Sequence, residues 1–245
     1  MIANLRIMML RIMRYLIYTG ICCLCPISAI SASLPTTPTI PTASTKEIKT
    51  NPPAFTIYPE GQQLYDLYPW STMYYYGVTF SDALIRMAYG EFHRWPEHIQ
   101  TIELSRTLSQ DNFLRRLVNP LVGVVQLSGN FTVRRGARQH TIYEVNPYLA
   151  FRWANLPWNH YVNTSLAIGE GISYDSSVPA LERKSDKDTK RLLNYLMLEA
   201  TFASPRYPRL QLVARVHHRS GAFGLYHAGN TGSNNVGLGI RYLFD

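Results

Sequence analysis

The feature that most constrains this chain is a two-residue alternation of apolar and polar side chains that recurs in long runs. Near the C-terminus, for example, Leu212, Ala214 and Val216 alternate with more polar neighbours as far as Ser220. A period of two places successive side chains on opposite faces of a β-strand. Eight such runs follow one another along the chain, at 73–80, 99–108, 121–134, 140–154, 161–174, 192–202, 210–220 and 235–244. The pattern predicts an all-β protein.

The length of these runs separates two classes of β protein. Strands of soluble proteins are typically about 5 or 6 residues long, whereas most of the runs here have 9 to 15 residues. Tilted strands of about ten residues are what a membrane-spanning barrel needs. We therefore predict an eight-stranded antiparallel transmembrane β-barrel over residues 71–245. The alternative is a soluble lipocalin-like barrel or a sandwich, which also alternates.

The two classes differ in which face of the strand is apolar. In Tyr161–Tyr174, one face carries small or polar residues such as Ser165 and Ser173, and the other carries Leu166, Ile168 and Ile172. Small polar residues suit the narrow interior of a small barrel, and bulky apolar residues suit contact with lipid. This distribution favours the membrane barrel.

The first 70 residues lack the two-residue alternation of the rest of the chain. Residues 1–33 combine Arg6, Arg11 and Arg14 with an apolar stretch and then small residues, which indicates a signal peptide. The alternative, an N-terminal membrane anchor, has a short apolar core interrupted by Pro26. Residues 34–70 form a Pro/Thr/Ser-rich linker and lead-in to the barrel. Together with the barrel, a signal peptide predicts the outer membrane of a Gram-negative bacterium, reached through the outer-membrane insertion machinery.

Charge and cysteine content exclude several functions. The three cysteines all lie within residues 1–33, so the mature chain has no disulfide framework and no thiolate metal site. The formal charge falls from +8 to +5 when the three arginines of that segment are removed. No zinc pattern or RNA-binding motif accompanies this excess, so we expect no nucleic-acid partner. We also expect no metal and no cofactor.

Several charged residues fall on the inward parity of their strands. Arg215, Arg219 and Arg241 are expected to pair inside the barrel with Glu103, Glu144 or Glu199, and His217 joins the same network. Such pairs would fill the lumen, because an eight-stranded barrel is too narrow for a wide pore. A narrow substrate channel is the alternative.

His218 and Ser220 stand out because they share the apolar, outward parity. Residues two apart on a strand point to the same side, with Cα atoms roughly 6.5–7 Å apart. A serine becomes a nucleophile when a base such as histidine accepts its proton, and the backbone at Gly221 would supply N–H groups to an oxyanion. The simpler interpretation is a pair of polar residues at the barrel rim.

The segment from His218 through Gly221 to Gly237, with an Asn-rich turn between, resembles the PagL-type lipid A 3-O-deacylases. These are eight-stranded outer-membrane barrels that remove an ester-linked acyl chain from lipid A with a Ser/His/Glu triad. The resemblance is specific over about the last 35 residues and architectural over the rest. It implies Ser220 as the nucleophile and His218 as the base, with an acyl chain of lipid A as the substrate. The family has an asparagine where this chain has Gly221, and its acid best matches Gly239.

The acid of the triad is therefore unassigned, and two glutamates are candidates. Glu170 shares the lipid-facing parity and lies two strands from His218, about 10 Å away at the usual strand spacing. Glu182 lies in the following loop, which is freer to approach. The sequence thus predicts an outer-membrane ester hydrolase acting on lipid A. The alternative is a non-catalytic small barrel with a structural or surface-binding role.

Overall fold

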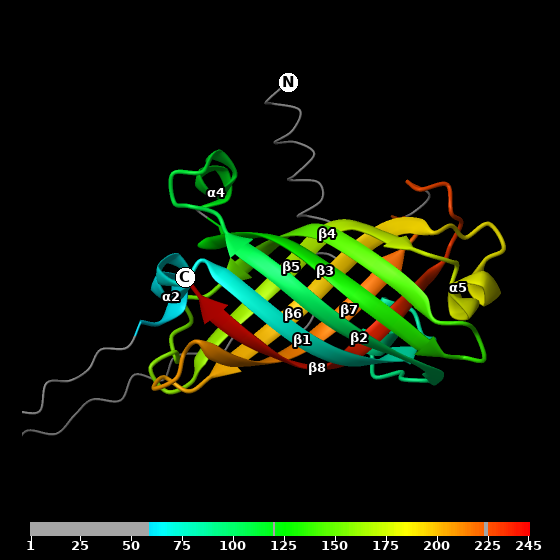
Figure 1. Cartoon of the computed structure of the whole chain (residues 1–245), viewed down its shortest axis with the longest axis horizontal. Coiled ribbons are helices and arrows are strands. Elements are labelled where there is room, and N and C mark those ends of the chain that lie inside the picture. The colour runs from blue at the N-terminus through cyan, green and yellow to red at the C-terminus, as the bar shows by residue number, and fades with distance from the viewer. Residues whose placement is uncertain (1–58, 120, 223–224) are drawn as a thin grey trace, which may run out of the picture. The chain divides into compact units, whose positions relative to one another are not determined.

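The computed structural model describes residues 59–119, 121–222 and 225–245 (Figure 1). The predicted signal peptide and most of the linker lie outside these residues. The strands are β1 Trp70–Phe80, β2 Arg94–Thr107, β3 Val124–Gly136, β4 Ile142–Trp153, β5 Asn163–Asp175, β6 Leu192–Ala203, β7 Leu210–Ser220 and β8 Gly232–Phe244. The helices are α2 Gly61–Leu67, α3 Leu84–Ala88, α4 Phe113–Val118 and α5 Ala180–Ser185.

The eight strands form a closed antiparallel barrel in which each strand pairs with its sequence neighbours and β1 pairs with β8. Each predicted run falls on one of these strands, so the predicted fold is confirmed. Strand β1 begins at Trp70, and the short helix α2 lies within the predicted lead-in. None of the helices in the described part of the chain is long and apolar enough to cross a bilayer.

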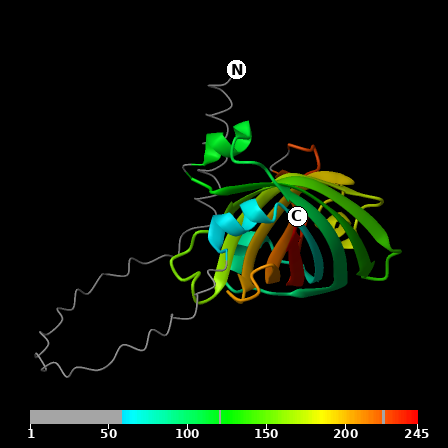
Figure 2. The same cartoon turned by 60° about the vertical axis from the view of Figure 1, so that its left-hand side comes forward.

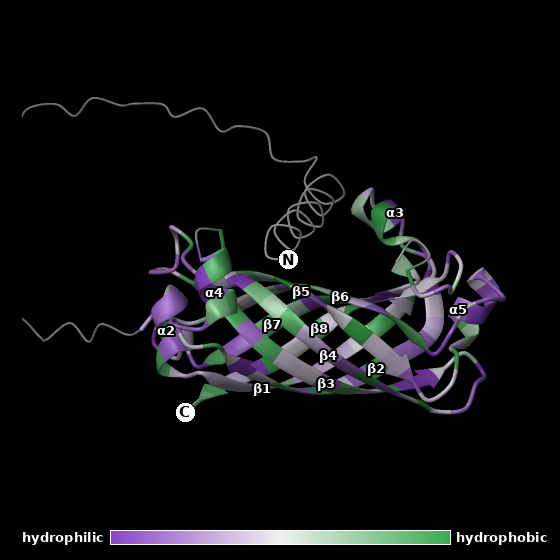
Figure 3. Ribbon diagram, turned by 90° about the horizontal axis from the view of Figure 1, so that it is seen from above, coloured by the Kyte–Doolittle hydropathy of each residue, from purple (hydrophilic) through white to green (hydrophobic). Residues whose placement is uncertain are grey.

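The barrel wall is apolar outside and polar inside. Leu166, Ile172 and Tyr174 of β5 are exposed on the outer face, whereas Ser165 and Ser173 are buried on the inner face. The same alternation runs around the wall in Figure 3, where green and purple positions succeed one another along the strands. An apolar exterior around a polar interior is the arrangement of a barrel in lipid and the reverse of a soluble barrel.

The middle of the lumen is filled by an ion-pair network that we call the Glu199 cluster, made of Glu103, Glu199, Arg152, Arg215 and Arg241. Arg215 Nη1 lies 2.6 Å from Glu103 Oε2, and Arg152 Nη2 lies 2.6 Å from Glu199 Oε1. Arg241 contacts both glutamates. The predicted inward pairing is confirmed for Arg215 and Arg241, and it leaves each charge of the cluster with a partner, as burial requires. For Arg219 the predicted partners are wrong, because it pairs with Asp175 and Glu182.

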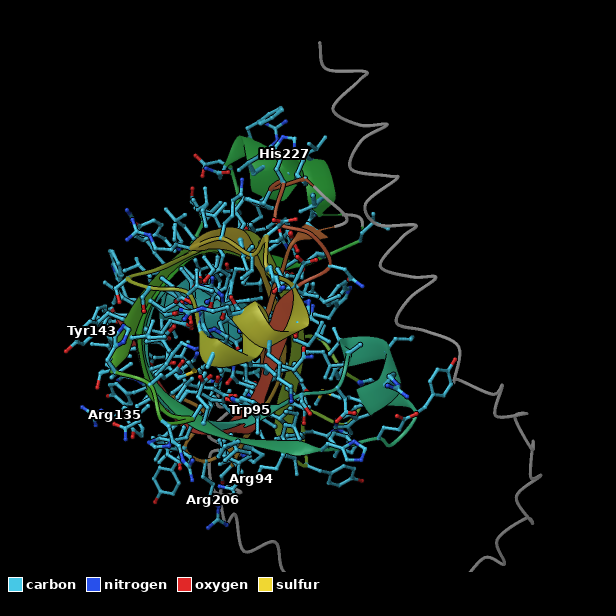
Figure 4. All side chains as sticks on the ribbon, turned by 90° about the vertical axis from the view of Figure 1, so that its right-hand side faces the viewer. Arg94, Trp95, Arg135, Tyr143, Arg206 and His227 are labelled. Carbon is cyan, nitrogen blue, oxygen red and sulfur yellow. The ribbon has the colours of Figure 1, made fainter. Side chains whose placement is uncertain are left out.

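A second network lies nearer the Ser220 end of the lumen. His217 Nε2 lies 2.7 Å from Glu144 Oε1, and Arg134 bridges Glu144 and Glu97. Figure 4, which views the barrel from the end where α5 lies, shows side chains crowding the inside of the ring of strands. A lumen filled in this way argues against a channel.

Helices α2 and α5 bring side chains into the two ends of the lumen. At the end where α2 and the C-terminus lie (Figure 2), Leu64 and Tyr65 are buried, and Tyr65 Oη lies 3.0 Å from Ser165 Oγ. At the other end, Leu181 and Glu182 of α5 are buried. Side chains therefore occupy both ends of the lumen. The outward residues of β7, which include His218 and Ser220, lie on the lipid-facing wall and not in the lumen.

Candidate active site

Strand β7 carries His218 and Ser220 on its lipid-facing side. Its inward residues Arg215, His217 and Arg219 are buried in the lumen networks, so the alternating residues must face outward. His218 and Ser220 are half-buried at the end of the strand, next to the connection that leads to β8. The predicted outward parity of this pair is confirmed.

The imidazole of His218 has a partner on the neighbouring strand. Asn234 of β8 lies directly opposite His218 in the register, and its Oδ1 lies 2.6 Å from His218 Nδ1. The same amide donates from Nδ2 to the backbone carbonyl of Asp82, 2.7 Å away, in the connection between β1 and β2. His218, Asn234 and the Asp82 carbonyl thus form a continuous hydrogen-bonded chain.

These two hydrogen bonds determine which nitrogen of the neutral His218 imidazole carries the proton. A backbone carbonyl can only accept a hydrogen bond, so the atom of Asn234 that faces Asp82 must be the amide nitrogen. Asn234 Oδ1 therefore faces His218, and Nδ1 of His218 must carry the proton that it donates. The other ring nitrogen, Nε2, is left as the basic atom. A base oriented through Nδ1 with Nε2 free is the arrangement found in serine and cysteine hydrolases, including the Cys-His-Asn variant.

Ser220 ends the strand between Asn194 of β6 and Gly232 of β8, which are its register partners. In the described part of the chain, no hydrogen bond joins Ser220 to His218. The two side chains nevertheless share a face at the i, i+2 spacing, within reach of one another by rotamer change. Catalytic hydrogen bonds are often long or unformed without substrate. The structure brings the pair to one surface without forming the contact.

The expected role of Gly221 needs correction. Its backbone N–H donates to the carbonyl of Thr231, 3.1 Å away, and so is not free to bind an oxyanion. A Cβ at this position would lie 2.5 Å from the carbonyl oxygen of Gly229. Glycine is required here because the two arms of the β7–β8 connection approach so closely.

Glu170 lies on the outward face of β5, as predicted, but it is not the hydrogen-bond partner of His218. Glu170 of β5 lies opposite Leu196 of β6, and Leu196 lies opposite His218 of β7. Glu170 and His218 are therefore two strand spacings apart, at about 4.8 Å each. The side chain of Asn194 on β6 lies beside the Glu170 carboxylate instead. Partial burial and the nearby charge of Glu170 raise the pKa of Tyr226, in the β7–β8 connection. Glu170 is thus part of a polar surface that continues to Ser220 through Asn194.

Glu182 as the acid is a prediction that the structure contradicts. Its side chain is buried in the lumen, where Oε1 accepts from Arg219 Nε at 3.1 Å and from Ser233 Oγ at 2.8 Å. Helix α5 lies over the interior of the barrel, whereas His218 faces the lipid. The barrel wall therefore separates Glu182 from the imidazole.

The position that best matches the family's acid, Gly239, does not lie beside His218. Gly239 lies opposite Val213, whereas the β8 residue opposite His218 is Asn234. The role of Asn234 could not be predicted from the sequence, because only carboxylates were considered as partners of His218. Asn234 was also expected to lie in the turn before the last strand. Pairing β7 and β8 outward from the closing turn would have found it.

An apolar groove lies on the wall, with its lining ending at Val216, two residues before His218. It has a volume of about 490 Å³ and is lined by residues of β6, β7 and β8, among them Leu198, Ala214, Val216, Val236 and Leu238. Val216 and Ala214 are the outward residues that precede His218 on β7. The groove lies in the middle of the wall, where Ala214 and Ala200 are small, and Val216 is its lining residue nearest to His218 along β7. Among the described residues, no group of three His, Cys, Asp or Glu side chains is placed to hold a metal ion.

Comparison with known proteins gives few matches. No protein-family model matches the chain, and neither does any curated protein. Among solved structures, the chain is similar to the crystal structure of the outer membrane enzyme PagL, with 14% identity, a TM-score of 0.45 and coverage of 70% of this chain and 98% of that chain. It is also similar to the crystal structure of Neisserial surface protein A, with 10% identity, a TM-score of 0.42 and coverage of 71% and 96%. We therefore derive function from this chain's own residues.

Proposed function

We propose that the chain is an outer-membrane ester hydrolase that removes an acyl chain from a membrane lipid, with lipid A as the substrate class. The observation that carries this proposal is the hydrogen bond between His218 Nδ1 and Asn234 Oδ1 on a lipid-facing wall. It makes Nε2 the basic atom of a neutral imidazole, on the same face of β7 as Ser220. A rim histidine needs no such orientation for structure.

The reaction follows from these positions. Ser220 Oγ attacks the ester carbonyl while His218 Nε2 takes the hydroxyl proton, which forms a tetrahedral oxyanion. His218 then gives that proton to the departing alcohol oxygen of the lipid, and the acyl group stays on Ser220. A water molecule, deprotonated by His218, attacks the acyl-serine and releases a fatty acid and free Ser220.

The oxyanion needs a donor other than the Gly221 N–H. Asn194 is the β6 residue directly opposite Ser220, and its amide has two N–H groups. This amide lies beside Glu170, and it is the donor that we assign to the oxyanion. Glu170 is then a positioning residue, because it orients the Asn194 amide without contacting the ester.

The apolar groove supports a lipid substrate. A bulky acyl chain lying along Val216, Ala214 and Leu238 would place its ester near Ser220 and its headgroup beyond the end of the strand. The site therefore faces the layer of lipid that surrounds the Ser220 end of the barrel. With the barrel in the outer membrane of a Gram-negative bacterium and its Ser220 end at the outer surface, that layer carries lipid A.

A second candidate is a barrel with a structural or surface-binding role and no activity. The observations that favour it are the engaged N–H of Gly221 and the absence, in the described residues, of a hydrogen bond from Ser220 to His218. In that case the hydrogen bond between His218 and Asn234 only stabilises the pairing of β7 with β8.

Mass spectrometry of lipid A separates the two candidates. The full-length chain is expressed in a Gram-negative host whose lipid A carries ester-linked acyl chains. We expect the native chain to shift the lipid A mass by the loss of one acyl group. Ser220→Ala and His218→Ala should each reduce deacylation by about 10³-fold or more, because each removes a group that reacts.

The controls test folding and specificity. Ser177→Ala replaces a serine of a connection at the same end of the barrel and should deacylate like the native chain. Heat-dependent migration of every variant on gels verifies a folded barrel. An unchanged acyl pattern with folded native protein would favour the non-catalytic barrel.

A further inference from the structure

The connection from Ser81 to His93 carries apolar side chains where a loop beyond the membrane would normally be polar. We call this connection the β1–β2 arm; it contains α3. Ile85, Tyr89 and Phe92 are 49%, 79% and 53% exposed. Three large exposed apolar side chains on one short connection indicate a contact surface.

The arm lies beside the barrel and not over its lumen. Figure 3 shows α3 to the side of the wall, at the end of the barrel where α5 lies. Its apolar residues continue the outer face of the wall, because Phe92 packs edge-on against Phe80 of β1 with ring centroids 5.5 Å apart. Tyr76 and Tyr74, further along the outward face of β1, are also exposed. The apolar exterior thus extends without interruption from the strand to the arm.

The base of the arm is held closed. Asp82 Oδ1 lies 2.9 Å from His93 Nδ1, and the Ser81 N–H donates to the His93 carbonyl at 2.9 Å. The backbone N–H of His93 also donates to Asp82, and these bonds hold the pKa of that carboxyl below its usual range. Arg86 and Glu91 neutralise one another at 3.0 Å. The arm therefore presents its apolar residues from a fixed base with little net charge.

We propose that the β1–β2 arm is an interfacial lipid-binding element, which buries Ile85, Tyr89 and Phe92 among the lipids of the same leaflet that the Ser220 end of the barrel faces. The occupant is lipid because the apolar surface is continuous with the lipid-facing wall. Amphipathic segments of this kind lie in the plane of the interface with their apolar side among the acyl chains.

The arm also contacts the candidate active site. The Asp82 carbonyl at its base accepts from Asn234 Nδ2, and Asn234 orients His218. We infer that lipid binding by the arm helps to hold the His218 imidazole in its productive orientation. This coupling rests on the proposed function, whereas the lipid contact does not.

Fluorophore quenching tests the lipid contact without any assay of activity. In the full-length chain with Cys22, Cys23 and Cys25 changed to serine, a cysteine is introduced by Tyr89→Cys, labelled, and reconstituted in lipid vesicles. We expect quenching by nitroxide lipids and protection from iodide in water. A label at Lys187→Cys, in the exposed connection after α5, is the matched control and should show the reverse.

Two results would overturn the proposal. One is a label at position 89 that iodide quenches as readily as the label at 187. The other is protection that disappears when the vesicles hold less protein per lipid, because that dependence would mean a second copy of the barrel covers the arm.

The coupling has its own measurement. In the triple variant Ile85→Ser, Tyr89→Ser, Phe92→Ser we expect about a tenfold loss of hydrolysis of vesicle lipid, and little change with a short-chain water-soluble ester. Equal loss on both substrates would contradict coupling through lipid. Unchanged hydrolysis of both would also contradict it, and failure of the native chain to hydrolyse either ester would reject the proposed function while leaving the quenching result intact.

Discussion

Replacing Glu199 by leucine is expected to destabilise the barrel strongly and to lower the yield of folded protein. Glu199 contacts Arg152, Arg215 and Arg241 in the middle of the lumen, and each of these guanidinium groups is almost completely buried. Removing the carboxylate leaves three buried cations with Glu103 as the remaining anion of the Glu199 cluster. Breaking a buried ion pair costs about 3–5 kcal/mol, which is a large fraction of the stability of a typical domain.

Heat-dependent migration of refolded protein on gels measures this effect. Glu170→Leu is the matched control, since it makes the same exchange on the outer face of the wall. It should fold as well as the native chain, because leucine suits a lipid-facing position. If Glu199→Leu folds as completely as Glu170→Leu, the Glu199 cluster does not hold the barrel together.

The second large effect is expected at Asn234, as a change in reaction rate. Asn234→Leu keeps the size of the side chain and removes the oxygen that accepts from His218 Nδ1. The imidazole is then free to adopt the tautomer in which Nε2 carries the proton and cannot act as a base. We expect about a hundredfold loss of ester hydrolysis, which is the lower end of what general base catalysis contributes.

Asn234→Asp distinguishes orientation from structure. An aspartate keeps an acceptor for His218 but loses the donor to the Asp82 carbonyl. If Asn234 acts by orienting the base, the aspartate variant should lose about tenfold, as when the arm is uncoupled from His218, and not the hundredfold expected of the leucine variant. Equal loss in both variants would indicate that Asn234 serves only to hold the β1–β2 arm.

The barrel could be predicted from the sequence because the information that defines it is local. A two-residue period in the sequence marks each strand. The same period predicted that Arg215 and Arg241 face the lumen and that His218 faces outward. The pairing of Arg215 with Glu103 and Glu199 follows once polar residues are known to face a closed interior. No knowledge of the loops is needed for these conclusions.

The site was only half predictable because its remaining members depend on register and on connections. Asn234 faces His218 only because β7 and β8 pair in one particular register, which the strand pattern alone does not define. Glu182 could not be assigned because parity says nothing about whether a loop helix turns into the lumen or toward the lipid. The engagement of the Gly221 N–H likewise depends on how closely Thr231 approaches.

The most direct test of the central claim is covalent labelling of Ser220 in the folded, full-length protein with a fluorophosphonate. The serine oxygen forms a bond to phosphorus and fluoride leaves, a reaction that requires an activated hydroxyl. We predict one adduct, on the peptide that contains Ser220, with labelling strongly slowed in His218→Ala and in Asn234→Leu. A folded native barrel in which Ser220 stays unlabelled, or reacts as fast without His218 as with it, would contradict the assignment of this pair as a catalytic nucleophile and base.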